Sequence, residues 1–187
     1  KGSAGGLKLE IVRIGRTEAL GMGDRVCIDT CTNMHAGEGI LVGNNSNAMF
    51  LVHSESIENP YVEPRPFRVN AGAVHAYTLV PEGKTRYLSE LKSGDESLVV
   101  NHKGETQTAV IGRVKVERRP LMLIEGETAE SKKVSLVLQN AETIRLTGKG
   151  GEAISVVELK KDSEVMGYST EGGRRFGIKV EETIVEK

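Results

Sequence analysis

A period-two alternation of apolar and polar residues, interrupted by turn residues about every ten positions, is the feature that most constrains this chain. Residues 7–14 read LKLEIVRI, and later runs are rich in β-branched residues between Gly, Asn, Asp and Ser. No long amphipathic helix is predicted, and only residues 87–91 suggest a short helical turn. The pattern therefore predicts an all-β barrel or sandwich with strands over residues 7–14, 25–30, 39–42, 48–52, 67–69, 74–80, 98–101, 108–117, 121–127, 134–138, 143–146, 154–157, 165–168 and 175–185.

A weak internal repeat accompanies these strands. Residues 87–98, YLSELKSGDESL, resemble residues 156–166, VVELKKDSEVM. The strands that follow contain GRVKVE from Gly112 and GIKVE from Gly177. Because such repeats usually form scaffolds, we expect residues 1–80 to carry the functional site and residues 81–187 to be mainly repeated β scaffold, with one continuous domain as the alternative.

Composition narrows the class of protein. The formal net charge is -1 and charged residues make up 27%, so no overall charge favours nucleic acid or an anionic membrane. No apolar run reaches the roughly 20 residues that span a bilayer, and we expect a soluble cytoplasmic protein. The two cysteines, Cys27 and Cys31, lack a zinc or redox spacing, and we expect both to be reduced in or near the core.

The stretch from residue 52 to residue 77 concentrates the chemically useful side chains. It reads VHSESIENPYVEPRPFRVNAGAVHAY and lies between two apolar runs. Pro60, Pro64 and Pro66 restrict the backbone, so residues 59–66 are expected to form a stiff, extended connector. Rigid support of this kind suits a catalytic or binding site.

Strand alternation places His53 and Glu55 on one face. An imidazole and a carboxylate at that spacing can share a proton or orient a water molecule, as general acid and base catalysis requires. The alternative is a strand end that emerges into solvent. The histidines and acids lack a recognisable metal-ligand spacing, so no metal is predicted.

Arg65, Arg68 and Asn70 surround a phenylalanine in PRPFRVNAG. Arginine binds carboxylates or phosphates in a two-pronged geometry and Asn can bind a hydroxyl, so the set suits a small polyhydroxy acid. The alternative is salt bridges to Glu58 and Glu63. His75 and Tyr77 are expected to share one strand face, either in the site or as ordinary half-buried residues.

The Gly-rich run from residue 37 to residue 43, GEGILVG, does not match a dinucleotide-binding fingerprint. Its last glycine is one position late and no helix pattern follows. Residues 37–43 are better interpreted as a turn and a strand.

Several motifs together resemble a known family. The runs GMGDRVCIDTC, GEGILVG, FLVHSE, NPYVEPRPFRVNAGAVHAY, TRYLSELKSGDE, IGRVKVERRPL, LQNAETIRL and FGIKVEETIVE span nearly the whole chain. They resemble the C-terminal half of the archaeal-type 3-dehydroquinate synthase, also called dehydroquinate synthase II.

The resemblance implies an NAD-dependent oxidative deamination of 2-amino-3,7-dideoxy-D-threo-hept-6-ulosonate and cyclisation to 3-dehydroquinate, in aromatic amino-acid biosynthesis. For that reaction we expect His53, supported by Glu55, to act as acid and base, and His75 or Tyr77 to stabilise an oxyanion. Arg65 and Arg68 would bind the substrate carboxylate and Asn70 would orient a hydroxyl or carbonyl. The NAD site is unassigned. The alternatives are a groove completed by the missing N-terminal half or by another chain, such as a second copy in a homo-oligomer, and the turns at residues 37–47.

Two other classes of function stay open at this point. The chain could be a non-catalytic β-barrel module that binds or assembles with the rest of a larger enzyme. An RNA-associated barrel is a third reading, and the near-neutral charge argues against it.

Overall fold

The computed structural model describes residues 6–170, and within them the regular structure is all β. Three short 3-10 helices, η1 (Pro81–Gly83), η2 (Leu88–Glu90) and η3 (Val156–Glu158), interrupt the strands, and η2 confirms the predicted helical turn. In this part of the chain no helix has the length and apolar character needed to cross a membrane. The strands are β1 (Glu10–Thr30), β2 (Glu38–Asn45), β3 (Ala48–His53), β4 (Arg68–Ala73), β5 (Tyr77–Val80), β6 (Lys84–Tyr87), β7 (Glu96–Asn101), β8 (Thr106–Thr128), β9 (Lys133–Gln139), β10 (Arg145–Thr147), β11 (Ala153–Ser155) and β12 (Glu164–Ser169).

The strands form one antiparallel sheet that closes on itself. β12 pairs with β1 and β3, β3 also pairs with β2, and β2 reaches β8 through β7, while β8 returns to β1. The hairpins β5–β6 and β10–β11 extend the ring at β2 and β3, and β4 and β9 pair with β1 and β8. The predicted all-β, barrel-like class is therefore confirmed.

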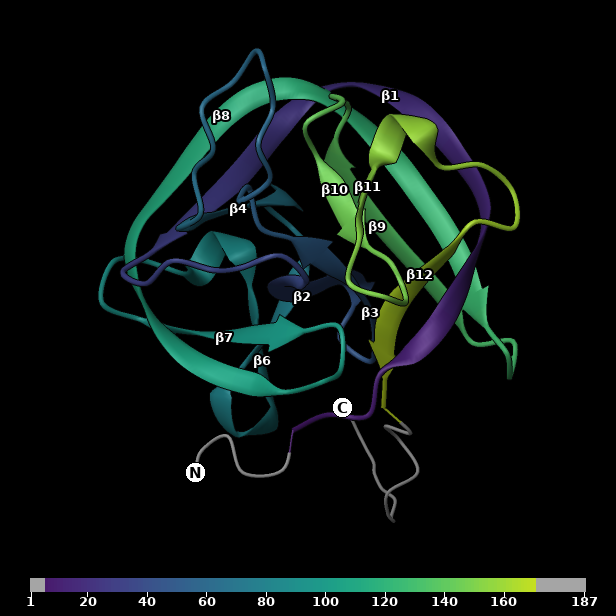
Figure 1. Ribbon diagram of the computed structural model, residues 1–187, viewed down its shortest axis with the longest axis horizontal. Helices are drawn as coiled ribbons and strands as arrows, with labels where there is room; N and C mark the ends of the chain where they lie inside the picture. Colours follow the sequence, from purple (N-terminus) through teal and green to yellow (C-terminus); the bar gives the residue numbers. More distant parts are fainter. Residues whose placement is uncertain (1–5, 171–187) are drawn as a thin grey trace.

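Two very long strands define the shape of the barrel. β1 and β8 run antiparallel beside one another from the Val12–Thr128 pair to the Thr30–Ile111 pair, and Figure 1 shows them as two curved ribbons. The prediction of separate strands within each was wrong. We call the paired strands β1 and β8 the ribbon. A register shift in this pairing lies at or beside Gly21, Gly23 and Pro120, which bend the ribbon instead of ending its strands.

The main core fills the inside of this ring. Alternate residues of β3 show how it is built: Phe50 and Val52 belong to the main core, whereas Met49 and Leu51 belong to a second apolar cluster. Because β3 is covered on both faces, all six of its residues are buried. The strand that leads into His53 is thus a rigid support.

The hydrogen-bonding pattern repeats along the chain. We call residues 10–101 unit A and residues 106–169 unit B. In both, a strand beside the long ribbon leads into a hairpin, a 3-10 helix and a strand that pairs with the other unit, so β7 pairs with β8 and β12 with β1. β2 and β3 belong to unit A alone. Equivalent backbone bonds join Leu88 N–H to Ala76 O and Val156 N–H to Ile144 O, then Gly94 N–H to Ile111 O and Asp162 N–H to Ile14 O, each at 2.8 Å.

This repeat matches the one predicted from residues 87–98 and 156–166. The second repeat of the GRVKVE type, at Gly177, lies outside the described residues. Within them, Gly112–Arg113 of β8 has its structural equivalent in Gly15–Arg16 of β1, since each follows an isoleucine, Ile111 or Ile14, whose carbonyl accepts the equivalent bond from the other unit. The division into residues 1–80 and 81–187 stays a prediction.

Two local expectations were wrong. Residues 59–66 are not one extended connector: isolated bridges Glu55–Arg65 and Asn59–Val62 fold residues 55–65 into an irregular hairpin, which projects at the top of Figure 1. Residues 74–80 are not one strand, because a turn at Val74 and His75 separates β4 from β5. That turn is closed by the bond from Ala76 N–H to Ala73 O.

Candidate functional site

A cluster of polar side chains lies on the outer face of β1 where β4 and β8 flank it. Antiparallel register sets Asp29 beside Arg68 of β4 and Arg113 of β8. The Nε and Nη2 of Arg68 donate to the two carboxylate oxygens of Asp29 at 2.7 and 3.0 Å, and Arg113 Nε donates at 3.2 Å. Burial alone would raise the pKa of Asp29, but the bonds and charges of the two arginines outweigh it and hold the pKa below its usual value.

Cys27 and Arg25 lie two and four residues before Asp29 on β1, and they continue the same face. Cys27 pairs with Asn70 across the β1–β4 ladder and is buried. Burial raises the pKa of its thiol to about 11, although the charge of Arg25 opposes the shift. Cys31 is exposed, so the expectation that both cysteines lie in or near the core was wrong for Cys31.

Arg25 begins a chain of buried hydrogen bonds. Its Nη1 donates to Gln139 Oε1 at 2.8 Å, and Asn70 Nδ2 donates to the same oxygen at 2.9 Å. Arg25 Nη2 also donates to Glu117. Arg25 and Asn70 are only 5% and 4% exposed, yet Arg25 Nε and Asn70 Oδ1 have no partner among the described residues. Buried polar atoms without partners are rare and point to a ligand or a water molecule.

Glu55 borders this cluster from the hairpin. Its backbone N–H donates to Arg68 O at 2.8 Å, and its carbonyl accepts from Arg65 N–H at 2.7 Å. Burial raises the pKa of its carboxyl group, and the positive charges of Arg68, Arg65 and Arg25 act against that shift. Among the described residues no cation lies within salt-bridge distance of the carboxyl, so Glu55 is a half-buried acid that arginines surround without neutralising.

His53 is 2% exposed and both of its ring nitrogens have backbone neighbours. Nε2 accepts the N–H of Gly37 at 2.8 Å, so the proton of the neutral ring sits on Nδ1 and is donated to Ser54 O at 2.8 Å. Burial lowers the pKa of His53, the Ser54 carbonyl opposes the shift, and the charge of Arg145 adds to it. The geometry describes a neutral imidazole that points toward Gly37, two residues from Glu55 but without a bond to it.

His75 and Tyr77 lie elsewhere. The turn exposes His75, and Tyr77 pairs with Tyr87 through their hydroxyls at 3.0 Å and through stacked rings 4.6 Å apart. The expected shared strand face does not exist, because the strand is broken between them. Within the described range, no hydrogen bond or ion pair joins either side chain to the polar cluster.

The structure thus brings together Glu55, Arg65, Arg68 and Asn70 from the predicted set. Sequence reasoning did not include Arg25, Asp29 or Gln139 in that set. The alternation in residues 25–30 contains part of the signal, since it puts Arg25, Cys27 and Asp29 on one face. Gln139 gave no signal, because only the fold brings the end of β9 to β4.

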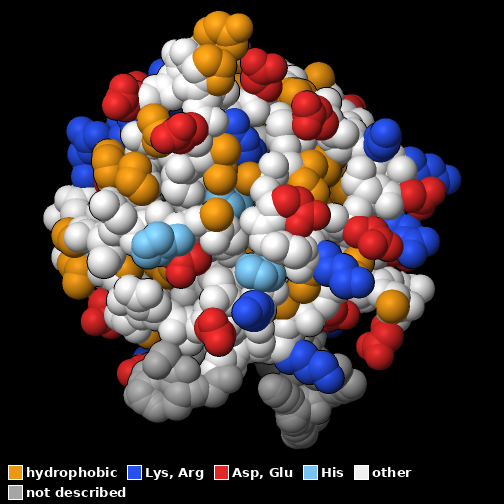
Figure 2. Space-filling model, in the orientation of Figure 1, with side chains coloured by type: hydrophobic (Ala, Val, Ile, Leu, Met, Phe, Trp, Pro, Cys, Tyr) orange, Lys and Arg blue, Asp and Glu red, His pale blue; other side chains and the backbone are white. Residues whose placement is uncertain are grey.

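Histidines gather at a second place, around the turn that precedes β2. His35 Nδ1 lies 3.4 Å from Glu38, and a side chain at Gly37 would meet His102 Nδ1 at 2.8 Å. Figure 2 shows histidine side chains near the centre of this face. In residues 6–170, however, no group of three or more His, Cys, Asp or Glu is placed to hold a metal ion.

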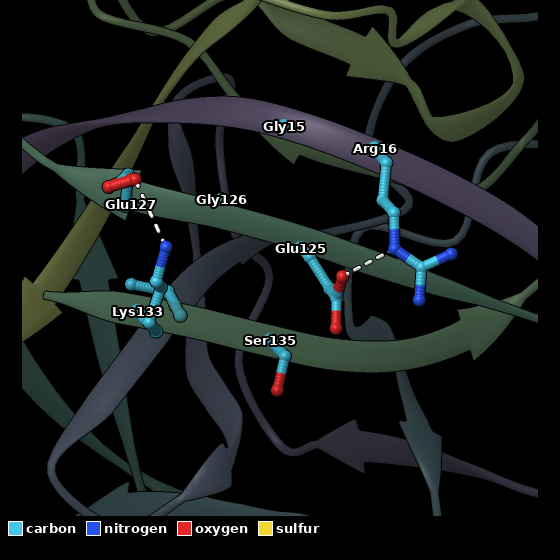
Figure 3. A pocket seen from close by; sticks show the side chains of 8 residues that line it. Gly15, Arg16, Glu125, Gly126, Glu127, Lys133 and Ser135 are labelled. Carbon is cyan, nitrogen blue, oxygen red and sulfur yellow. Dashed lines mark hydrogen bonds and ion pairs between the residues drawn. The ribbon is translucent and has the colours of Figure 1, made fainter. Parts of the chain in front are cut away.

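A surface groove of about 450 Å³ lies at the corresponding place in unit B, far along the ribbon from the polar cluster. Figure 3 shows Arg16 bonded to Glu125 and Lys133 bonded to Glu127 across it, with Ser135 on β9. Glu125 pairs in register with Arg16 and Ser135, as Asp29 pairs with Arg113 and Arg68. The groove is open because Ser135 is small where unit A has Arg68, and its ion pairs are solvent-exposed and weak.

Comparisons with known proteins agree on one family. The model described as 3-dehydroquinate synthase II C-terminal domain matches residues 11–187. The chain is 60% identical over 182 residues to the "3-dehydroquinate synthase homolog" of Aquifex aeolicus (strain VF5), covering 96% of this chain and 55% of the relative. It is 54% identical over 187 residues to the 3-dehydroquinate synthase of Methanoregula boonei, covering 100% and 57%, and 58% identical over 183 residues to that of Methanopyrus kandleri, covering 96% and 45%.

The chain therefore spans about half the length of the curated relatives it matches. No solved structure matches it.

Proposed function

The chain belongs to the 3-dehydroquinate synthase II family, whose C-terminal domain it matches, and from this premise we propose that it binds and helps to convert the substrate of that enzyme. The proposed reaction is the NAD-dependent oxidative deamination of 2-amino-3,7-dideoxy-D-threo-hept-6-ulosonate and its cyclisation to 3-dehydroquinate. The observation that carries the proposal is the family match over residues 11–187. The polar cluster beside Glu55 supports its location.

Arg65 is the proposed partner of the substrate carboxylate. Arg68 was the other candidate, but Asp29 occupies its Nε and Nη2. Arg65 is half-buried, and within the described residues its side chain makes no hydrogen bond or salt bridge, so its whole guanidinium fork is free. In this arrangement Arg68 supplies positive charge and fixes the backbone of Glu55, while Arg65 makes the contact.

Glu55 is the proposed proton carrier. Cyclisation needs a proton removed next to a carbonyl group so that the resulting carbon nucleophile can add to a second carbonyl. A carboxyl group whose pKa is raised by burial is a better base than an ordinary carboxylate. His53 is proposed to assist from its fixed neutral form, and to accept a proton only if it releases the N–H of Gly37.

The oxyanion role of His75 and Tyr77 stays a prediction. A substrate held by Arg65 would have to extend past the end of β4 to reach either residue. Asn70 is better placed to meet the substrate, because it lies on the same face as Arg68 and next to Glu55.

The Gly-rich run of residues 37–43 does not fit the diphosphate of NAD. Gly39 and Gly43 of the Gly-rich run lie against the backbone of β3, where a side chain would collide with Val52 O and Ala48 O. Their small size thus serves strand packing and leaves no room for a diphosphate. The NAD site therefore stays unassigned, and no step is derived through it.

Calorimetric titration of the chain with the seven-carbon amino-keto acid tests the proposal. Saturable binding is expected, and Arg65→Ala should weaken it by more than about tenfold, as the loss of a charge-assisted hydrogen bond predicts. Lys149→Ala is the matched control, since it removes an exposed positive charge outside the cluster. A folded chain that binds no substrate would overturn the proposal.

The second candidate function is a non-catalytic assembly module. One observation favours it: Tyr61 at the tip of the hairpin is 87% exposed, and Val62 beside it is 41% exposed. Exposed aromatic residues are typical anchors of protein interfaces. If Tyr61→Ser abolished association with the remainder of the synthase while the chain alone bound no substrate, this function would be preferred.

A further inference from the structure

Units A and B allow the polar cluster to be compared with equivalent positions in the same chain. Asp29 pairs with Arg68 and Arg113, and Glu125 pairs in the same way with Ser135 and Arg16. Two residues further along each strand, Cys27 and Asn70 of unit A correspond to Leu123 and Val137 of unit B. Another two residues along, Arg25 of unit A corresponds to Leu121 of unit B.

The equivalent positions in unit B are apolar. Leu121 and Val137 form a small buried cluster with Ala73 of unit A, and Leu123 packs against it. Aliphatic side chains are therefore sufficient to fill these positions of the barrel. Buried charges and amides are no more stabilising than well-packed apolar residues of similar volume, and often less so. The fold does not require Arg25 or Asn70 at these positions, which points to a role in the site.

Donor and acceptor chemistry fixes how Arg25 acts on Asn70. A guanidinium can only donate, so Gln139 must turn its Oε1 toward Arg25. The same oxygen then requires the NH₂ group of Asn70, which settles the orientation of that amide. The Oδ1 of Asn70 is left buried and without a partner in the described part of the chain.

We infer that Arg25 and Gln139 are positioning residues of the substrate site, which hold Asn70 so that its Oδ1 accepts a hydrogen bond from the ammonium or a hydroxyl group of the substrate. This inference rests on the proposed function. The carboxyl group of Glu55, the proposed proton carrier, neighbours the Asn70 amide.

Substitutions at Gln139 separate positioning from packing. Gln139→Glu keeps an acceptor for both Arg25 and Asn70 and should bind the amino-keto acid within about threefold of the parent chain. Gln139→Leu has a similar size but no acceptor, and should weaken binding by about tenfold or more, the loss expected for one hydrogen bond to a charged group. A purely structural role predicts the reverse order, because the new carboxylate is harder to bury than leucine.

Arg25→Leu is the second variant and introduces the residue found at the equivalent position in unit B. It should fold with an unchanged or raised Tm, since Glu117 keeps Arg119 and Lys115 as partners, yet bind substrate at least tenfold more weakly. Arg16→Leu is the control, because it removes an arginine of β1 that lies in the groove of Figure 3, away from the polar cluster, and should leave binding unchanged. If the parent chain binds and Arg65→Ala does not, but Arg25→Leu binds normally, this inference fails and the proposed function stands.

Two ligands identify the group that Asn70 contacts. The keto acid that lacks the amine and the amino acid that lacks one hydroxyl are titrated against the parent chain and Arg25→Leu. The effect of the substitution should disappear with the ligand that lacks the contacted donor. An effect of equal size with both ligands would overturn the assignment of Oδ1 as the acceptor.

Discussion

At the scale of single residues, the burial of Glu55 should lower the stability of the folded chain while it makes the carboxyl group a better base. A carboxyl group of raised pKa favours the folded state when it is protonated and costs free energy when it is ionised. Its contribution is therefore fully present below its ordinary pKa of 4.5 and is lost as the pH rises through the folded-state value.

Glu55→Gln should accordingly raise the Tm at neutral pH, and the gain should shrink as the pH falls toward 4.5. Thermal unfolding of both chains across that range is the measurement. Glu58→Gln, at an exposed position in the same hairpin, is expected to change the Tm little. A Tm gain that does not depend on pH would contradict the role of burial.

The two thiols should differ sharply in reactivity. Cys31 is exposed, whereas Cys27 is buried and its pKa is raised to about 11. Because the thiolate is the reactive form, a thiol reagent at pH 8 should modify about one group per folded chain and a second only after unfolding. Cys31→Ser should remove the fast reaction, and rapid labelling of that variant would contradict the buried position of Cys27.

At the scale of elements, β4 lies close to β9 through Gly72. This glycine has φ +109°, and a side chain there would collide with the carbonyl oxygen of Val137. Gly83 also has a positive φ, +73°, but nothing lies within 4 Å of a side chain built there. Comparing substitutions at Gly72 and Gly83 therefore separates the cost of backbone strain from the cost of steric collision.

Gly83→Ala should cost about 1 kcal/mol of unfolding free energy, from strain alone. Gly72→Ala should cost more than about 3 kcal/mol, because β4 and β9 must also move apart. Urea unfolding measures both. Equal losses would show that β4 can retreat from β9 freely, and the position of Asn70 would then be less fixed than described.

The all-β class and the local part of the site could be predicted from the sequence. Glu55, Arg65, Arg68 and Asn70 lie within sixteen consecutive positions, so a short stretch already implies that they are neighbours. Arg25 and Gln139 could not be added, because they meet only through the register of β1, β4, β8 and β9. The continuity of β1 was missed for a related reason: Gly21 and Gly23 signal a turn locally, while pairing with β8 keeps the strand extended.

At the scale of the whole molecule, each unit completes the sheet of the other. β7 of unit A pairs with β8, and β12 of unit B pairs with β1. Neither unit can lose its last strand without opening the ring. Stability should therefore be a property of the complete barrel.

Hydrogen exchange should report the same opening free energy for protected amides of β7 and β12, and urea should unfold the chain in one transition. A substitution in β12 such as Gly167→Val, which would press against Met49 O, should reduce protection in both strands equally. Loss confined to β12 would mean that unit A folds by itself.

The exchange of β7 and β12 between the units is also the arrangement that two identical chains would make around a two-fold axis. A gene duplication that joined two such ancestors would leave a spare copy of every position on the ribbon. One copy could keep Leu121, Leu123 and Val137 and hold the barrel together, while the other was free to acquire Arg25, Cys27 and Asn70. In that history, the barrel could tolerate buried charges in one unit because the equivalent positions of the other unit kept their aliphatic side chains.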